Sequence, residues 1–328
     1  MPPAPARTSD QAETTILVLG APRSGTTWLA KIFDSHPAVL YRHEPDEIRP
    51  APPDLTPDRL RPLIQTWIAD RCLRTATKRP FFPKSWQSPP ARLLRTGLAY
   101  AMNAAARLPG LGAALGRLSV PDLGASGQAR TVIKSVRWCG GAGVFADALP
   151  DSRTVLILRH PCGQVASVMR GARQQRFDLR EPGTDMPFDE AQAIRRSARS
   201  GIDEPAFQAL PDAAKYAWAW VAFNETAASA LQHRPNARIV IYEALCAAPE
   251  AEAKALFEFA GLSWDPQTAA FIARSTSHTG AAGYYAVLAD SIAAANRWRT
   301  TMAGADQDAV RAVLRRSSLA RFWPDLAA

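Results

Sequence analysis

Residues Gly20 to Thr27, with the sequence GAPRSGTT, hold two glycines, three hydroxyl side chains and one arginine within eight positions. An aliphatic run precedes them and a helix-like pattern follows. At such a strand-to-helix turn, successive backbone N–H groups point at one place, and the helix dipole favours negative charge there. The chemistry that this segment predicts is the binding of a phosphate or a similar anion.

The spacing of Gly20 and Gly25 resembles a Walker A loop, but Thr26 stands where that loop has its lysine. The cation is Arg23, inside the loop, where it would lie beside a shorter anionic group than a triphosphate. The indole of Trp28 is suited either to stacking on a base or to core packing. The candidate anion-binding residues are Arg23, Ser24, Gly25, Thr26 and Thr27.

A second anion site is predicted at Arg159, which closes the apolar run 154–158. Pro161 then begins a helix that carries Ser167. An arginine at the end of a strand, beside a helix N-terminus, is suited to holding a phosphate. Two such sites indicate a ligand with two separated phosphates.

These residues require strands that deliver them to one edge of a sheet. β-branched and aliphatic runs predict strands over 15–19, 131–135, 153–158 and 238–242, and helical patterns follow over 26–33 and 249–259. Strands that alternate with helices predict an α/β fold with a P-loop-like parallel sheet flanked by helices. Ligands of such sheets bind at the carboxyl ends of the strands.

The predicted organisation is a mobile N-terminal tail over 1–14 and one domain over 15–328, with helical cap segments at 45–130 and 171–212. We expect the cap segments to shape the site of a second substrate.

Composition narrows the class of protein. A hydrophobic fraction of 47% and a charged fraction of 21% are ordinary for a globular chain and exclude a disordered or coiled-coil protein. The formal charge of +9 suits an anionic ligand. Arginines interrupt the most apolar stretch, 93–118, so no membrane span is expected. The four cysteines lack metal-ligand spacing, so no metal site is expected. The N-terminal residues lack the apolar core of a secretory signal, so a cytoplasmic location is expected.

The strings PRSGTTWL (22–29) and RHPCGQVAS (159–167) resemble the two phosphate motifs of sulfotransferases that use 3′-phosphoadenosine 5′-phosphosulfate, PAPS. Tyr242, Glu243 and Leu245 match a later strand of that family, and the resemblance extends from Thr15 to about Tyr242. The two motifs in this order are specific to the family.

The resemblance implies a role for each matching residue. Residues 23–27 would bind the 5′-phosphosulfate, and Trp28 would stack on adenine. The 3′-phosphate end would be held by Arg159, Ser167 and Tyr242. Lys134, at the end of the second predicted strand, would touch the transferred group, and Arg23 would neutralise the leaving oxygen.

The general base is expected outside the position that cytosolic phenol and steroid enzymes use, because Val136 stands where they have histidine. The segment 34–47 looks closer to bacterial and Golgi-type branches, including tyrosylprotein sulfotransferases, which have a glutamate here. That residue is Glu44, and burial beside an anion would raise its pKa. His43 is the rival base; in an extended segment adjacent residues point to opposite faces, so only one would face the acceptor.

Three other functions remain as alternatives. A P-loop kinase or nucleoside triphosphatase would explain the first loop, but the chain lacks the lysine and a clear acidic strand end for magnesium. An NADP-dependent oxidoreductase would explain the GxGxxA pattern of Gly141, Gly143 and Ala146. A nucleic-acid-binding protein would explain the basic charge, although Trp218 and Trp220 have the spacing of a buried helix face.

For the sulfotransferase, the expected acceptor is a small-molecule, carbohydrate or lipid alcohol, by preference over a protein chain or nucleic acid. The triplet Arg297, Trp298 and Arg299 fits either a basic loop over the 3′-phosphate or ordinary packing. The sequence leaves these alternatives and the oligomeric state open.

Overall fold

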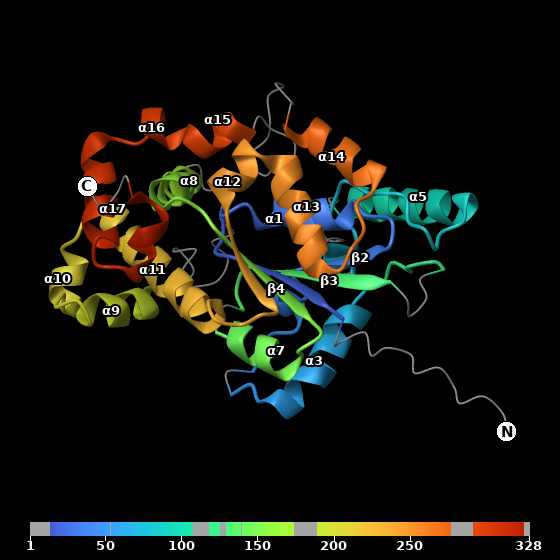
Figure 1. Cartoon of the computed structure of the whole chain (residues 1–328), viewed down its shortest axis with the longest axis horizontal. Coiled ribbons are helices and arrows are strands. Elements are labelled where there is room, and N and C mark those ends of the chain that lie inside the picture. The colour runs from blue at the N-terminus through green and yellow to red at the C-terminus, as the bar shows by residue number, and fades with distance from the viewer. Residues whose placement is uncertain are drawn as a thin grey trace.

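The computed structural model describes residues 14–52, 54–106, 108, 118–124, 129–138, 140–173, 189–276 and 291–324 (Figure 1). The predicted N-terminal tail, apart from Thr14, lies outside the described residues, and so do residues 174–188 of the second cap segment.

A five-stranded parallel sheet forms the centre of the molecule, in the order β2-β3-β1-β4-β5. The predicted α/β class with a parallel, helix-flanked sheet is confirmed. Four strands lie within one or two residues of their predicted bounds. A fifth was not predicted, because its sequence VLYRH mixes apolar and charged residues, although all five are buried. The strands are β1 (Ile16–Leu19), β2 (Val39–His43), β3 (Arg130–Ser135), β4 (Arg153–Leu158) and β5 (Ala237–Ile241).

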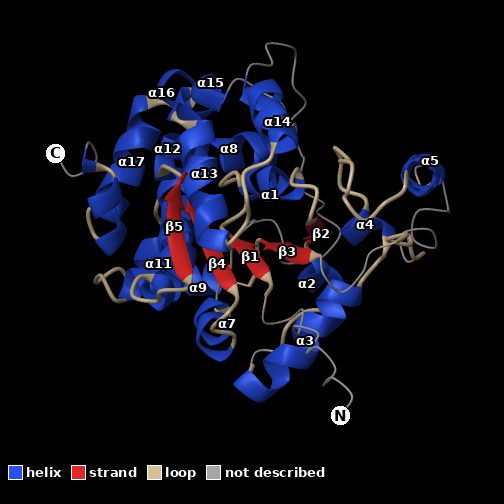
Figure 2. Ribbon diagram, turned by 45° about the vertical axis from the view of Figure 1, so that its right-hand side comes forward, coloured by secondary structure: helices blue, strands red, loops and turns tan. Residues whose placement is uncertain are grey.

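Helices cover both faces of this sheet, as Figure 2 shows. Those that position the site or carry the core are α1 (Thr26–Asp34), α2 (Pro45–Ile48), α3 (Pro57–Ala69), α4 (Leu73–Ala76), α5 (Pro89–Ala105), α7 (Ala142–Ala148), α8 (Pro161–Arg173), α11 (Asp212–Leu231), α12 (Tyr242–Ala247), α13 (Pro249–Ala260) and α14 (Pro266–Thr276). The remaining ones are α9 (Glu190–Ala198), α10 (Glu204–Gln208), α15 (Ser291–Asn296), α16 (Trp298–Thr301), α17 (Gly304–Leu314) and the short 3₁₀ helix η1 (Ser318–Phe322). No helix in these ranges combines the length and the apolar content needed to cross a bilayer.

The central strand β1 sends alternate side chains into two separate hydrophobic clusters. Leu17 and Leu19 join the cluster with α3, α7, α8 and α11, whereas Ile16 and Val18 join the one with α1, α12, α13 and α14. Successive side chains of a strand point to opposite faces, so a strand covered on both faces must be apolar throughout. The uniformly aliphatic sequence of β1 therefore places it in the middle of the sheet.

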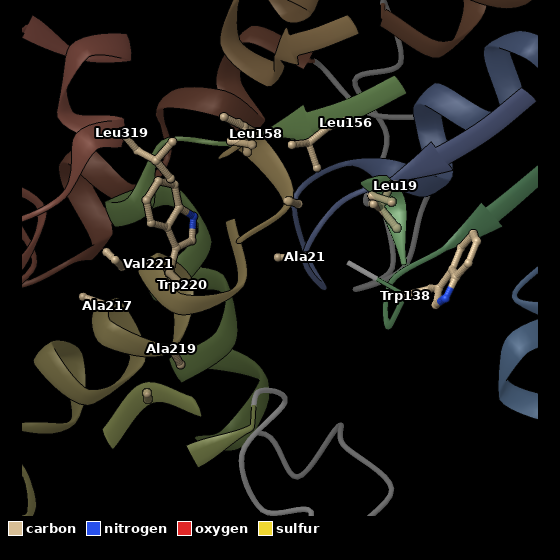
Figure 3. Close-up of a cluster of buried hydrophobic side chains, with 14 of the residues drawn as sticks. Leu19, Ala21, Trp138, Leu156, Leu158, Ala217, Ala219, Trp220, Val221 and Leu319 are labelled. Atoms are coloured by element: carbon tan, nitrogen blue, oxygen red, sulfur yellow. The ribbon is translucent and has the colours of Figure 1, made fainter. Parts of the chain in front are cut away.

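The aromatic residues of α11 belong to the first cluster. Trp218 and Trp220 are fully buried, and Trp220 reaches toward Leu319 in Figure 3. The indole N–H of Trp220 donates to the side-chain oxygen of Gln164 at 2.9 Å. The prediction of a buried helix face is confirmed, and this helix offers no stacking platform for nucleic acid.

The segment 45–130 leaves the sheet after β2 and returns at β3, its direct neighbour. It contains α2, α3, α4 and α5. Helix α3 packs into the main core through Leu60, Ile64 and Trp67. In contrast, α5 lies at the outer edge of the molecule and buries only Ala99 (Figure 1). The segment is therefore part core and part outer wall.

Candidate active site

The loop between β1 and α1 is closed by two glycines whose missing side chains leave room for neighbours. A Cβ atom on Gly20 would lie 2.7 Å from the hydroxyl of Ser24. One on Gly25 would lie 2.5 Å from the ring of Tyr242, and Gly25 also has a φ of +96°. The left-handed region strains residues with a side chain, so glycine is required at this position on two counts.

The loop presents donors that nothing in the described structure satisfies. The hydroxyl of Ser24 is buried and has no hydrogen-bond partner among the described residues. Helix α1 begins at Thr26 without a side-chain cap, so its first N–H groups point into the same space. A phosphate-sized anion fits such a set of donors, because an orphaned buried hydroxyl is costly until a ligand accepts from it.

The second predicted corner, at the end of β4, lies directly against the first. Arg159 donates through one Nη to the carbonyl of Arg23 at 3.0 Å and through the other to that of Ala294 at 2.9 Å. Its guanidinium stacks over the ring of Tyr242, 4.7 Å from the centroid. The Nε of Arg159 is buried and has no partner in the described part of the chain. Arg159, Tyr242 and the loop thus form one site.

Helix α8 ties the two corners together. The Nε of Arg23 donates to the hydroxyl of Ser167 at 3.2 Å. Gln164, one turn earlier, donates to the carbonyl of Pro22 at 2.7 Å. Gln164 was not predicted as a site residue, because a glutamine in a helix carries no signal of its own. Arg23 has a φ of +70°, which is the conformation that turns its side chain toward α8.

Trp28 is 7% exposed and packs edge-on against Tyr242, with ring centroids 6.2 Å apart. Its indole N–H donates to Ser275 at 3.0 Å. Of the two interpretations left open by the sequence, core packing is the one that these contacts support. The indole still borders Tyr242, which itself closes over Gly25.

The other edge of the sheet carries Glu44 and Lys134. The backbone N–H of Glu44 donates to the carbonyl of Lys134 at 2.8 Å, and the ammonium of Lys134 forms an ion pair with the Glu44 carboxylate. Lys134 is paired in register with His43 on β2. Both ionic side chains are buried, with 3% and 12% exposed.

The pKa of Glu44 differs from the sequence expectation. Burial alone would raise the pKa of this carboxylate, but the attraction of Lys134 lowers it below its ordinary value. Burial is also the main cause that lowers the pKa of Lys134, and the nearby guanidinium of Arg23 lowers it further. The expectation of a raised pKa was wrong because it did not include a buried ammonium beside the carboxylate.

His43 lies on the same side as Glu44, contrary to the prediction that the two face apart. Its Nε2 is 3.7 Å from a carboxylate oxygen of Glu44, and its Nδ1 is 2.8 Å from the hydroxyl of Tyr41. The reason is that Glu44 has a φ of 48° and leaves the strand in a left-handed turn, which breaks the alternation of faces. Burial, followed by repulsion from Lys134, keeps the pKa of His43 well below its ordinary value, so its ring is neutral at pH 7.

Two further side chains border this cluster. The hydroxyl of Ser135 donates to Asp46 at 2.7 Å and fixes the end of β3 against α2. Lys78, from the chain that follows α4, has a pKa lowered first by burial and then by repulsion from Lys134. Neither Ser135 nor Lys78 was predicted as a site residue. Lys78 comes 34 residues after Glu44, in irregular chain without a motif.

The GxGxxA pattern and the triplet 297–299, the two weaker sequence patterns, contain residues with packing roles. A Cβ on Gly143 would lie 3.3 Å from Ala230 of α11, and one on Gly141 would overlap Trp138, so these glycines permit close contact. Trp298 is buried and stacks on His160 with centroids 4.3 Å apart. The GxGxxA pattern therefore has a structural explanation that needs no dinucleotide.

Comparison with known proteins adds the family. A model described as the sulfotransferase family matches residues 15–266. Solved structures with a similar course of the chain include a sulfotransferase domain from the curacin biosynthetic pathway, with 14% identity over 92% of this chain and 96% of that one and a TM-score of 0.43. Another is a mouse sulfotransferase complexed with PAP, with 14% identity over 95% and 89% of the two chains and a TM-score of 0.42. No curated protein matches in sequence.

The family match spans more than half of the chain and includes both anion-binding corners, β2 with the adjoining Glu44, and β3. The chain belongs to the sulfotransferase family.

Proposed function

We propose that the protein transfers a sulfuryl group from PAPS to a hydroxyl (or amine) group of an acceptor, with Glu44 as the general base. The observation that carries this proposal is that two anion-binding corners and a buried Glu44–Lys134 pair lie at the carboxyl ends of neighbouring strands. PAPS, when bound, supplies the sulfuryl group and leaves as adenosine 3′,5′-bisphosphate, PAP.

The nucleotide would be held by the residues whose donors face the two corners. The 5′ end fits residues 23–27, where the Ser24 hydroxyl lacks a partner among the described residues and α1 begins without a side-chain cap. The 3′-phosphate end fits Arg159, whose Nε has no partner in the described ranges, together with Ser167 and Tyr242. Trp28, beside Tyr242, would border the adenine.

Glu44 would accept the proton of the acceptor hydroxyl as its oxygen bonds to sulfur and the bond from sulfur to the bridging oxygen breaks. Its lowered pKa keeps it ionised at neutral pH, which is the state that accepts a proton. Lys134 and Arg23 would neutralise the transferred group and the leaving oxygen. An anion that draws the ammonium of Lys134 away from Glu44 would raise the pKa of Glu44 and strengthen it as a base. The neutral His43 would orient the carboxylate.

Calorimetry with four ligands tests the nucleotide. We expect PAP to bind tightly without magnesium. ATP with magnesium, NADP and an oligonucleotide should each bind with far lower affinity. A preference for one of the other three would overturn the proposal and support the corresponding rival. Transfer of radiolabelled sulfate from PAPS to a panel of small-molecule, carbohydrate and lipid alcohols then identifies the acceptor class. The same assay, run on separated fractions of cells that contain the native protein, tests the expected cytoplasmic location. Transfer activity should occur in the cytoplasmic fraction.

A further inference from the structure

A small cavity lies between α1, β2 and the chain that runs from α4 to α5. Its volume is about 40 Å³. A single water needs roughly 10–15 Å³ on this measure, so the cavity holds a group of about three non-hydrogen atoms. Tyr41, Phe81 and Phe82 form an aromatic part of its wall. It is separate from the two nucleotide corners, which lie along β1, β4 and α8.

Three donors of residues that line this cavity have no acceptor within the described part of the chain. The indole N–H of Trp86 and the Nε–H of Arg95 are buried without a partner there. Lys78 is only half-buried, and among the described residues its ammonium makes no ion pair or hydrogen bond. Buried donors are normally satisfied. Two buried orphan donors beside an unpaired ammonium indicate an anionic ligand that accepts hydrogen bonds.

The charges around the cavity select a negative ligand. Lys31 and Lys84 share the single carboxylate of Asp34, at 2.6 and 2.9 Å. The other lining carboxylate, Asp122, is divided among three arginines, including the buried Arg42 at 2.5 Å. The lining cations therefore outnumber the lining carboxylates, and Lys78, which forms no ion pair with a described residue, adds positive charge that they leave uncompensated.

Residues that line the cavity also contact the neighbours of the proposed base. Tyr41 lines the cavity and holds His43 at 2.8 Å, and His43 lies 3.7 Å from Glu44. Lys78 lines the cavity too, and Lys134 and Glu44 influence its titration. A molecule anchored here by one end is therefore close to the Glu44 carboxylate.

We propose that this cavity binds a carboxylate of the acceptor through Lys78, Trp86 and Arg95, so that the acceptor is a hydroxylated organic acid. The substrate class rests on the proposed function, whereas the carboxylate site itself does not require it. A planar group of three atoms with two acceptor oxygens matches both the room and the donors.

Binding of phenylacetate and of its neutral amide, phenylacetamide, to the full chain tests the site by ligand-observed NMR. We expect saturable binding of the acid and at least about tenfold weaker binding of the amide, since the amide lacks the charge. Equal binding of the two, or no binding of the acid, overturns the proposal. PAP is omitted from one series and added in another, so a failure of the proposed nucleotide leaves this result readable.

Two variants assign the site to these residues. Trp86→Phe keeps the ring and removes the N–H, and Lys78→Met keeps the stem and removes the charge; each should weaken phenylacetate about fivefold to tenfold. Trp264→Phe and Lys254→Met, which lie outside the cavity lining, are the matched controls and should bind as the wild type does. Unchanged binding in both cavity variants, with unchanged unfolding midpoints, would place the acid elsewhere and reject the assignment.

Discussion

The two edges of the site are built in different ways. On the side proposed to bind the nucleotide, the donors come from short continuous motifs at the ends of β1 and β4, and Arg159 contacts the loop directly at 3.0 Å. On the side proposed to bind the acceptor, Glu44, which follows β2, and Lys134 of the neighbouring strand β3 are 90 residues apart, and Lys78 comes from irregular chain. A phosphate can be bound by one local turn of backbone, but a base and its partners require side chains that only the tertiary fold brings together.

The largest predicted effect comes from replacing the proposed base, which should change the transfer rate without changing nucleotide binding. Glu44→Gln should lower the transfer rate by about 10²–10⁴-fold, because an amide cannot accept the proton, while the affinity for PAP stays unchanged. Single-turnover transfer and PAP calorimetry on the same preparation measure both. Glu47→Gln, three residues later in α2, is the control and should retain turnover. Normal turnover by the Glu44 variant would remove it as the base.

The converse effect is predicted at the nucleotide edge. Arg159→Ala should weaken PAP binding by about tenfold to hundredfold, since charge-assisted hydrogen bonds contribute about 1.5–3 kcal/mol. At saturating PAPS its transfer rate should change much less. Arg153→Ala, at the opposite end of the same strand, is the matched control and should leave PAP affinity intact. Equal weakening in both variants would mean that the strand, and not the corner, is responsible.

A third change tests how strictly the loop depends on its neighbours. Gly25→Ala places a Cβ 2.5 Å from Tyr242 at a φ of +96°, and should cost about 1–3 kcal/mol of unfolding free energy as well as PAP affinity. Urea unfolding measures the first quantity. Gly140→Ala, where a Cβ would meet nothing within 4 Å, should be tolerated. If Gly25→Ala is as stable as the wild type, the close approach of Tyr242 is not a constraint.

The smallest expected effect concerns pH and the buried ion pair. The pKa of Glu44 is lowered in the folded chain, so the pair stabilises the fold above the ordinary carboxylate pKa, and this is lost as the pH falls through the folded-state pKa. Lys134→Met removes the main attraction that lowers the pKa and leaves burial opposed only by the weaker effects of His43 and Arg74, so the pKa rises and the ionised form is penalised. The variant should be about 1–3 kcal/mol less stable than the wild type at pH 7, and less so near pH 4.

Urea unfolding at the two pH values measures this difference. Lys254→Met, which removes an exposed partner of Glu250, should show the same small change at both. A deficit of Lys134→Met that does not shrink toward pH 4 would show that the ammonium does not control the titration of Glu44.

The sequence predicted the parts of the molecule whose signal is local. The runs that became β1, β3, β4 and β5 are aliphatic, and both corners follow them directly, so their bounds and their meeting point were predictable. Strand β2 was missed because its buried Arg42 and His43 resemble a surface segment until their partners are known.

The acceptor side shows the limits of prediction more clearly. Lys134 became a candidate through the resemblance to the family, which has a lysine at the end of this strand, but its pairing with Glu44 depends on the register of β2 on β3. The left-handed turn at Glu44 changed the face of one residue and brought His43 and Glu44 together. Lys78, Trp86 and Arg95 line one cavity with Tyr41 of β2 only through the tertiary fold of the chain from α4 to α5, which no local pattern encodes.

The segment 45–130 departs from one strand and comes back on the strand hydrogen-bonded to it. Because both ends of this excursion are anchored on adjacent strands and α5 buries only Ala99, we expect α5 to accept a different sequence without a change in the order of the strands. Under the proposed function, acceptor preference could then be engineered separately from nucleotide binding, provided that α3 and Phe82, which fill the two cores, are kept.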